Sequence, residues 1–227
     1  MLKNCKIIII LFFITFPFTS ESHVQHYNNL NHVEFDIYRN DKNIGKHTFS
    51  FIKKDNQFTV KSEINFEIKK FGVVLDKYHV IGTEIYQDGE LVKFNSKTNQ
   101  NGKKKYVNLK LVNGEYEIDG SSYKGNAPSD YLLGTWWNHS IVKAKAQISA
   151  VSGRIIKQKV TFLGKEEIKL GNKSYKTLHF NFSSTDKKLD KDKKLNTDVW
   201  YDESNLNWIK ASFDKVGKWE YKLSSIQ

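Results

Sequence analysis

The sequence predicts an all-β protein: a single antiparallel curved sheet or barrel of about eleven strands with a short helical plug. Apolar and polar residues alternate through most of the 227 residues, and neither a linker nor a repeat divides them. In residues 78–119, three dipeptides separate four alternating segments: Asp88-Gly89, Asn101-Gly102 and Asn113-Gly114. These residue types tolerate positive φ and favour two-residue hairpin turns, so the stretch predicts three consecutive hairpins, a meander.

The N-terminal segment has the pattern of a secretory signal peptide. Lys3 and Lys6 precede an apolar run over residues 7–18, and small residues follow, ending with Ser22 before His23. A basic segment, an apolar segment and a small-residue cleavage site in this order are typical of exported proteins. We expect cleavage near Ser22 and His23, which leaves a periplasmic mature protein.

A transmembrane anchor is the alternative interpretation of this segment. An anchor requires about 20 apolar residues, whereas this run is shorter and contains Pro17. We expect residues 1–22 to form the signal peptide, with cleavage after Ser20 as the second choice, and residues 23–227 to form a single β domain without a transmembrane anchor. The mature chain then contains no cysteine, because Cys5 is the only one, and disulfides do not stabilise it.

Alternating segments on both sides of the meander predict the remaining strands. Residues 57–69 show the clearest pattern, with Phe58, Val60 and Phe66 on one face and polar residues such as Lys61 on the other. One buried face and one solvated face are typical of an antiparallel sheet. The other predicted strands cover residues 33–38, 44–53, 155–163, 167–170, 174–183, 197–202, 208–214 and 218–223.

Residues 121–140 interrupt the alternating pattern. We expect a helical insertion over residues 129–146, with one short helix capped by Ser129 and Asp130 and another capped by Asn138. Such an insertion cannot join the ladder of strands, so its apolar side chains must bury themselves against the concave face of the sheet. Residues 131–139 of the insertion are therefore predicted to close one end of the barrel, as a plug or a lid, and to form the mouth of any pocket.

The chain is basic, with a formal net charge of +11 and a run of charged residues at 186–196. A basic surface on an exported protein favours an anionic envelope component as a partner and disfavours nucleic acid. The favoured interpretation of the basic surface, however, is that exposed lysines keep the strands soluble and prevent edge-to-edge pairing. We interpret residues 186–196 as a solvated hairpin tip, with a polyanion-binding finger as the alternative, and we expect a monomer.

The chain contains no sequence motif for nucleophilic catalysis, metal binding or cofactor binding. The G-x-S-x-G elbow, the H-E-x-x-H motif, the P-loop and the dinucleotide fingerprint are all absent. His23, His26 and His32 lie in a polar N-terminal arm without the spacing of metal ligands. We therefore predict no catalytic residue, no metal and no cofactor. A hydrolase would need to bring together acids from the set Glu84, Asp88, Asp198 and Asp202.

Most of the aromatic residues are expected to pack in the interior of the barrel, and a ligand cavity lined by some of them is the alternative. The chain has 5 Trp, 15 Phe and 11 Tyr, a generous supply for one core. Trp136 and Trp137 are adjacent and stand outside the alternating strands, so at least one indole must point away from the core of its own element. If the strand face that bears Glu84 is the interior, its carboxylate must be hydrogen-bonded or have a raised pKa. The candidate ligand-binding residues are Tyr131, Trp136, Trp137, His139, Glu84 and Tyr86.

Four segments of the chain resemble an exported bacterial family. They are FDIYRNDKNIGKHTFSF at residues 35–51, residues 84–102, SGRIIKQKVTFLGKEEI at residues 152–168, and VWYDESNLNWIKASF with the later WEYKL. The chain is similar to the family catalogued as domain of unknown function 6134, with Tyr86 where that family has Trp. The resemblance implies the fold and no established reaction. More remotely, the topology is similar to that of periplasmic lipoprotein-carrier folds, in which a curved antiparallel sheet wraps round a helical plug.

These observations favour a non-enzymatic envelope protein that binds a hydrophobic or amphiphilic ligand, such as a lipid, in a β-barrel. A structural or partner-binding envelope module with a basic surface is the alternative, and an envelope hydrolase is the second alternative. Salt separates the first two classes, because screening weakens exposed charge contacts and leaves apolar burial largely intact.

Overall fold

The computed structural model describes residue 27, residues 29–190 and residues 193–227. The predicted signal peptide, residues 1–22, lies outside the described residues. The described chain forms one sheet of fifteen strands in a continuous order without hydrogen-bonded closure. The predicted all-β class with a curved sheet is confirmed, but the prediction of eleven strands was too low.

The first half of the sheet is a meander in which each strand pairs antiparallel with the next. The meander predicted for residues 78–119 is confirmed within it. Asp88, Asn101 and Asn113 have φ of 49°, 51° and 51° and each precedes a glycine, as two-residue hairpin turns require. The strands are β1 (His32–Arg39), β2 (Lys42–Lys54), β3 (Gln57–Lys70), β4 (Val73–Gln87), β5 (Glu90–Gln100), β6 (Lys103–Val112), β7 (Glu115–Gly120) and β8 (Lys124–Pro128).

The second half joins the first through a pairing of the last strand with the first one. One pair in the described sheet is parallel, between the two short strands that follow the meander, so the prediction of a wholly antiparallel sheet was wrong at this edge. Residues 155–163 and 167–170 form one strand with an irregularity between Phe162 and Gly164. The strands are β9 (Leu132–Leu133), β10 (Ala146–Ile148), β11 (Ile155–Leu170), β12 (Lys173–Ser184), β13 (Asn196–Asp202), β14 (Trp208–Asp214) and β15 (Lys218–Ile226).

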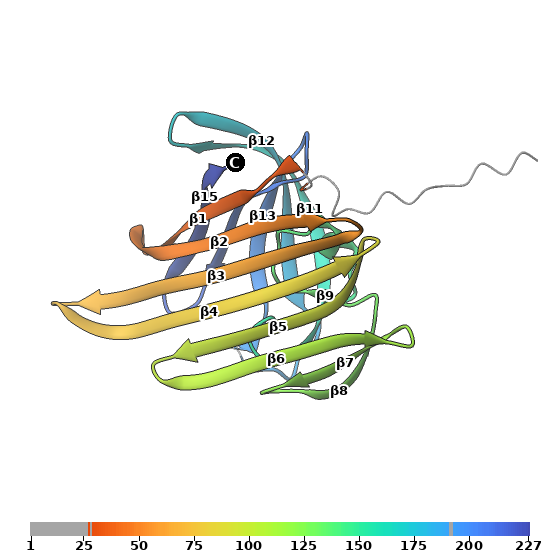
Figure 1. The fold of residues 1–227 in the computed structure, drawn as a ribbon. Coiled ribbons are helices and arrows are strands. Elements are labelled where there is room, and N and C mark those ends of the chain that lie inside the picture. The colour runs from red at the N-terminus through yellow and green to blue at the C-terminus, as the bar shows by residue number, and fades with distance from the viewer. Residues whose placement is uncertain (1–26, 28, 191–192) are drawn as a thin grey trace, which may run out of the picture.

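The sheet curls so that the meander forms one wall and the strands from β9 to β13 lie behind it (Figure 1). A seam of loop contacts brings the two walls together near the free edges. Ser122 N donates to Ser152 O at 2.9 Å, and Ser96 Oγ donates to Ala150 O at 2.5 Å. The approach is close because Gly120 has no side chain: a Cβ there would lie 2.6 Å from Ser152 O.

The predicted helical plug is much shorter than expected. One 3₁₀ helix, η2 (His139–Lys143), follows Asn138, whose side-chain oxygen accepts from Ser140 N at 3.0 Å. The expected cap at Asn138 is therefore confirmed. The helix expected after Ser129 and Asp130 is absent, because these two residues form a turn that leads into the extended residues of β9.

The hydrophobic core lies on the concave face of the sheet. It includes residues from both walls and from the insertion, such as Phe35, Phe94, Trp137 and Val199. In β3 the predicted inner residues Phe58 and Val60 are buried, as expected. Among the described residues, no helix has the length and apolar character needed to cross a membrane.

Candidate ligand cavity

A large cavity occupies part of the concave face beside the core. Its volume is about 1010 Å³, and its wall includes residues from the meander, the 134–136 segment, the 147–156 region and the last two strands. Apolar and aromatic side chains supply much of the wall. These include Ile64, Phe66, Tyr78, Val80, Phe94, Trp136, Phe213, Trp219 and Tyr221.

Two buried nitrogens in the cavity wall make no hydrogen bond within the described part of the chain: Nδ1 of His47 and Nε1 of Trp136. The His47 ring packs among aromatic rings, 4.2 Å from Phe49 and 5.9 Å from Tyr221 between centroids. Burial lowers the pKa of His47 to about 3. A neutral imidazole and an indole N–H therefore offer polar contacts in a mostly apolar cavity.

Several cationic side chains of the cavity are exposed or half-buried, so they are in reach of both the cavity and solvent. Arg39, Lys105, Arg154 and Lys215 all belong to its wall, and Asp76 is the one carboxylate among the described wall residues. The Arg39 guanidinium donates from Nε to Val216 O at 3.1 Å and lies 5.7 Å from the Trp219 ring centroid. An apolar interior with a cationic mouth is complementary to an amphiphile with an anionic group.

Glu84 lies on the inner face of β4 but outside the cavity wall. Its Oε2 accepts a hydrogen bond of 2.6 Å from the Tyr86 hydroxyl, and its Oε1 accepts one of 3.0 Å from Trp137 Nε1. Burial raises the pKa of Glu84 to about 7, although these hydrogen bonds and the nearby Thr135 act in the opposite direction. The Glu84 carboxylate is therefore hydrogen-bonded and also has a raised pKa, as expected of a carboxylate on the inner face. This hydrogen-bonded cluster of Glu84, Tyr86 and Trp137 connects the insertion to the meander.

The adjacent indoles of Trp136 and Trp137 lie in different environments because of the backbone conformation at Trp136. Trp136 has φ of 57°, in the left-handed region that bulky residues rarely adopt. Its indole lies against Trp208 and Tyr221, with centroid distances of 5.6 and 6.0 Å. Trp137 is 1% exposed and packs on Phe51 at 5.7 Å. Trp137 is therefore part of the plug, and Trp136 is part of the cavity wall.

Of the six candidate ligand-binding residues, Trp136 lines the cavity. Glu84, Tyr86 and Trp137 form the hydrogen-bonded cluster described above. His139 is buried with its ring 4.7 Å from Tyr201, and Tyr131 is half-buried against the core. None of these five belongs to the cavity wall. Contact between any of the six and a ligand stays a prediction.

Sequence analysis did not single out His47, Arg39 or Trp219 as parts of a site. His47 stands in phase with Phe49 and Phe51 in the alternation of β2, which signals an inward position. Arg39 and Trp219 lie in register on paired strands, β1 and β15. The sequence alone does not show that these two residues are neighbours, because they are 180 positions apart and only the pairing of β1 with β15 brings them together.

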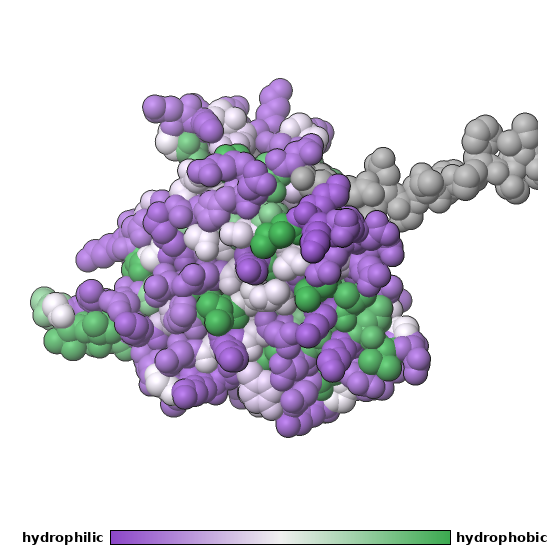
Figure 2. Space-filling view, in the orientation of Figure 1, coloured by the Kyte–Doolittle hydropathy of each residue, from purple (hydrophilic) through white to green (hydrophobic). Residues whose placement is uncertain are grey.

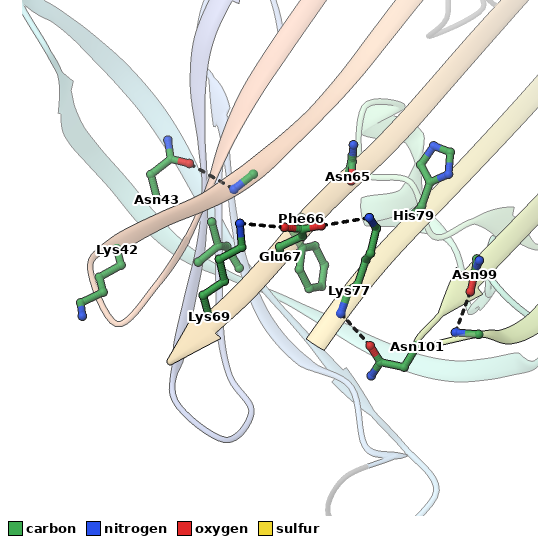
Figure 3. A pocket seen from close by; sticks show the side chains of 13 residues that line it. Lys42, Asn43, Asn65, Phe66, Glu67, Lys69, Lys77, His79, Asn99 and Asn101 are labelled. Carbon is green, nitrogen blue, oxygen red and sulfur yellow. Dashed lines mark hydrogen bonds and ion pairs between the residues drawn. The ribbon is translucent and has the colours of Figure 1, made fainter. Parts of the chain in front are cut away.

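A second hollow lies on the outer face, at the ends of strands β2 to β5, with a volume of about 820 Å³ (Figure 3). Its polar side chains largely satisfy one another. Glu67 pairs with Lys69 at 3.1 Å and with Lys77 at 3.0 Å, and Asn101 Oδ1 accepts from Lys77 N at 2.7 Å. Ile44 and Phe66 are the large apolar residues among its mostly polar lining, so this hollow suits an amphiphile less well than the cavity on the concave face does.

A polar cluster on the outer face joins β11, β12 and β13. His179 Nδ1 lies 2.6 Å from Glu166 Oε1, and its Nε2 lies 3.4 Å from Asp198 Oδ1. The ring stacks on Trp200 at 4.2 Å, and Trp200 Nε1 donates to Glu166 at 3.1 Å. Asp198 thus lies on the outer face, whereas Glu84 is buried on the inner face. The acids considered for a hydrolase therefore do not meet in the cavity.

Asp88 and Asp202 also lie outside the cavity wall. Asp88 is exposed in the β4–β5 turn, and Asp202 accepts from Ser204 N at 2.8 Å near the end of β13. Within the described ranges, no group of three or more His, Cys, Asp or Glu side chains has the arrangement of a metal site.

The fold and the cavity define a barrel-like curved-sheet protein with a hollow region on its inner face. The model of the domain of unknown function DUF6134 matches residues 35–224, so the chain belongs to this family. No curated protein matches the chain. A similar solved structure is the crystal structure of a β-barrel-like protein of domain of unknown function DUF1849 from Brucella abortus. It has a TM-score of 0.59 and 11% identity, and the match covers 87% of this chain and 97% of that one. This likeness concerns the fold.

Proposed function

We propose that the protein is an exported, non-enzymatic carrier or receptor that binds an amphiphile in the cavity on its concave face. The observation that carries this proposal is a cavity of about 1010 Å³ with aromatic walls and with Arg39 and Lys215 at its mouth. Pockets for hydrophobic ligands have mostly apolar walls with a few polar groups that orient the ligand. The chain of the ligand packs against residues such as Phe66 and Trp136, and its anionic group pairs with the cations.

The unpaired His47 Nδ1 and Trp136 Nε1 support a ligand that carries an additional polar group along its chain. Buried polar atoms without partners cost free energy, and a bound ligand that supplies hydrogen bonds removes this cost. An ester, hydroxyl or amide near these nitrogens fits their chemistry.

The test uses the chain from His23, which contains every strand and every core residue of the described sheet. Native mass spectrometry is expected to find a co-purified lipid, and a dansylated fatty acid is expected to bind with enhanced fluorescence. Arg39→Gln with Lys215→Gln should weaken binding of the fatty acid more than binding of its uncharged methyl ester. If neither the dansylated fatty acid nor its methyl ester binds the protein after any co-purified lipid has been removed, the proposal is refuted. Equal loss for acid and ester would refute the role of the cations.

A further inference from the structure

Two hairpin tips beside the cavity mouth carry exposed apolar residues. Phe71 in the β3–β4 turn is 93% exposed, and Val216 in the β14–β15 turn is 85% exposed. Val73 and Leu75, which follow Phe71, are 61% and 56% exposed. An apolar group stands out at the left edge of Figure 2, where the β3–β4 hairpin protrudes in Figure 1. Leu75 and Val216 also belong to the cavity wall.

The backbone at both tips would suit a polar residue better. Phe71 and Val216 have φ of 51° and 49°, and each is followed by a glycine. Asn101 and Asn113 occupy the same conformation at other hairpin tips, both with φ of 51°. Asn tolerates this left-handed conformation, whereas aromatic and β-branched residues are strained in it. Neither folding nor solubility explains an exposed Phe or Val at these positions.

Lysines surround the apolar tips. Lys69 and Lys70 precede Phe71, with Lys70 Nζ 5.6 Å from the centroid of its ring, and Lys215 precedes Val216. Apolar residues flanked by lysines are complementary to the interface of an anionic bilayer, because the apolar groups enter the acyl region while the cations remain near the phosphates.

We propose that the β3–β4 and β14–β15 hairpin tips dock on an anionic lipid bilayer, with Phe71 and Val216 inserted and the cavity mouth facing the membrane. Docking goes beyond the proposed function, because the tips do not need a ligand in the cavity to bind lipid. Leu75 and Val216 belong both to the tips and to the cavity wall. They therefore offer an amphiphile a short apolar path between the bilayer and the cavity.

The first test is co-sedimentation of the chain from His23 with vesicles of phosphatidylcholine, alone or mixed with phosphatidylglycerol. The double variant Phe71→Asn with Val216→Asn should bind the mixed vesicles about tenfold or more weakly, because two apolar side chains no longer leave water. Asn suits both turns, so this variant should remain folded. Ile52→Thr is the matched control, because it removes a 45% exposed apolar residue from β2 and should leave vesicle binding unchanged. Equal binding by the double variant and the parent would overturn the proposal.

The second test places an environment-sensitive fluorophore at a single cysteine, which is feasible because the chain from His23 has none. The label on Phe71→Cys should shift to the blue on mixed vesicles, and the label on Asn113→Cys, in the same turn conformation, should not. The proposal is wrong if the label at residue 71 does not respond, or if both labels respond equally. A blue shift without vesicles that grows with protein concentration would instead indicate self-association through the tips and would also overturn it. The single variant Phe71→Asn, at a residue outside the cavity wall, should bind mixed vesicles more weakly and still bind the dansylated fatty acid in solution, so the two proposals fail separately.

Discussion

The indole N–H of Trp137 donates a 3.0 Å hydrogen bond to Oε1 of Glu84, a carboxylate that is 1% exposed. The bond links the insertion after β8 to the C-terminal part of β4, across 53 positions of sequence. A second bond, from the Tyr86 hydroxyl, satisfies the other oxygen. A buried acid is tolerated only with such partners, so Glu84 fixes where the plug sits against the sheet.

The first prediction concerns the pH dependence of stability, where Glu84 and His47 oppose each other. Burial raises the pKa of Glu84 from 4.5 to about 7, so its contribution to folding stability is lost as pH rises through this range. Burial lowers the pKa of His47 from 6.5 to about 3, so its contribution rises with pH over that range. Between about pH 4.5 and 6.5 the two slopes, each roughly 1.4 kcal/mol per pH unit, cancel.

Single variants should expose each slope. In Glu84→Gln the free energy of unfolding should rise with pH over this window, by up to about 3 kcal/mol, and in His47→Gln it should fall by a similar amount. The buried phenols of Tyr86, Tyr116 and Tyr221 stay neutral, because burial raises their pKa values. Urea unfolding across the window measures both slopes. The double variant is the control, and parallel profiles for all four proteins would contradict the assignment.

The meander could be predicted because its turns are marked by local sequence signals. The other features of the fold depend on long-range contacts, which the sequence pattern does not show. Asp88, Asn101 and Asn113 mark turns by residue type alone, because positive φ is a local requirement. The pairing of Glu84 with Trp137 depends on how the sheet curves, which alternation does not encode. The short strands β8, β9 and β10 were missed because two to five residues are too few to show a period.

The candidate site was predictable only in part for the same reason. Alternation placed Glu84 and Tyr86 on one face of their strand but left open whether that face is the inner one, as their burial shows it to be. The position of Trp136 and Trp137 outside the alternating strands indicated that the two indoles have different environments. The cavity wall, however, includes residues from β1 to β5 and from β15, and Arg39, His47 and Trp219 come together because the two ends of the chain pair.

The second prediction separates the two indoles. Trp137→Ala should lower the free energy of unfolding by about 3 to 5 kcal/mol, because it removes a fully buried side chain and leaves the Glu84 oxygen without its donor. Trp136→Ala should cost less and should weaken binding of the dansylated fatty acid, since Trp136 lines the cavity. Thermal unfolding and fluorescence titration of both variants provide the comparison. Equal stability losses together with unchanged ligand binding would show that both indoles serve the core.

The third prediction concerns the seam between the two walls of the curved sheet. A Cβ on Gly120 would lie 2.6 Å from Ser152 O and 3.0 Å from the Cα of Gly153, which are backbone atoms held by the Ser122 to Ser152 hydrogen bond. Because backbone cannot yield as a side chain does, Gly120→Ala should destabilise the protein by about 1 to 3 kcal/mol.

The matched control for the seam is Gly82→Ala in β4. Its Cβ would meet Ser62 Oγ at 2.8 Å, and this hydroxyl can rotate away, so the loss of stability should be smaller. Urea unfolding of both variants compares the two costs directly. If the walls are joined only by the pairing of β1 with β15, Gly120→Ala will cost no more than Gly82→Ala. A larger cost for Gly120→Ala, with amide hydrogen exchange increased at Ser122, whose N–H donates to Ser152 O across the seam, means that the seam holds the cavity walls together.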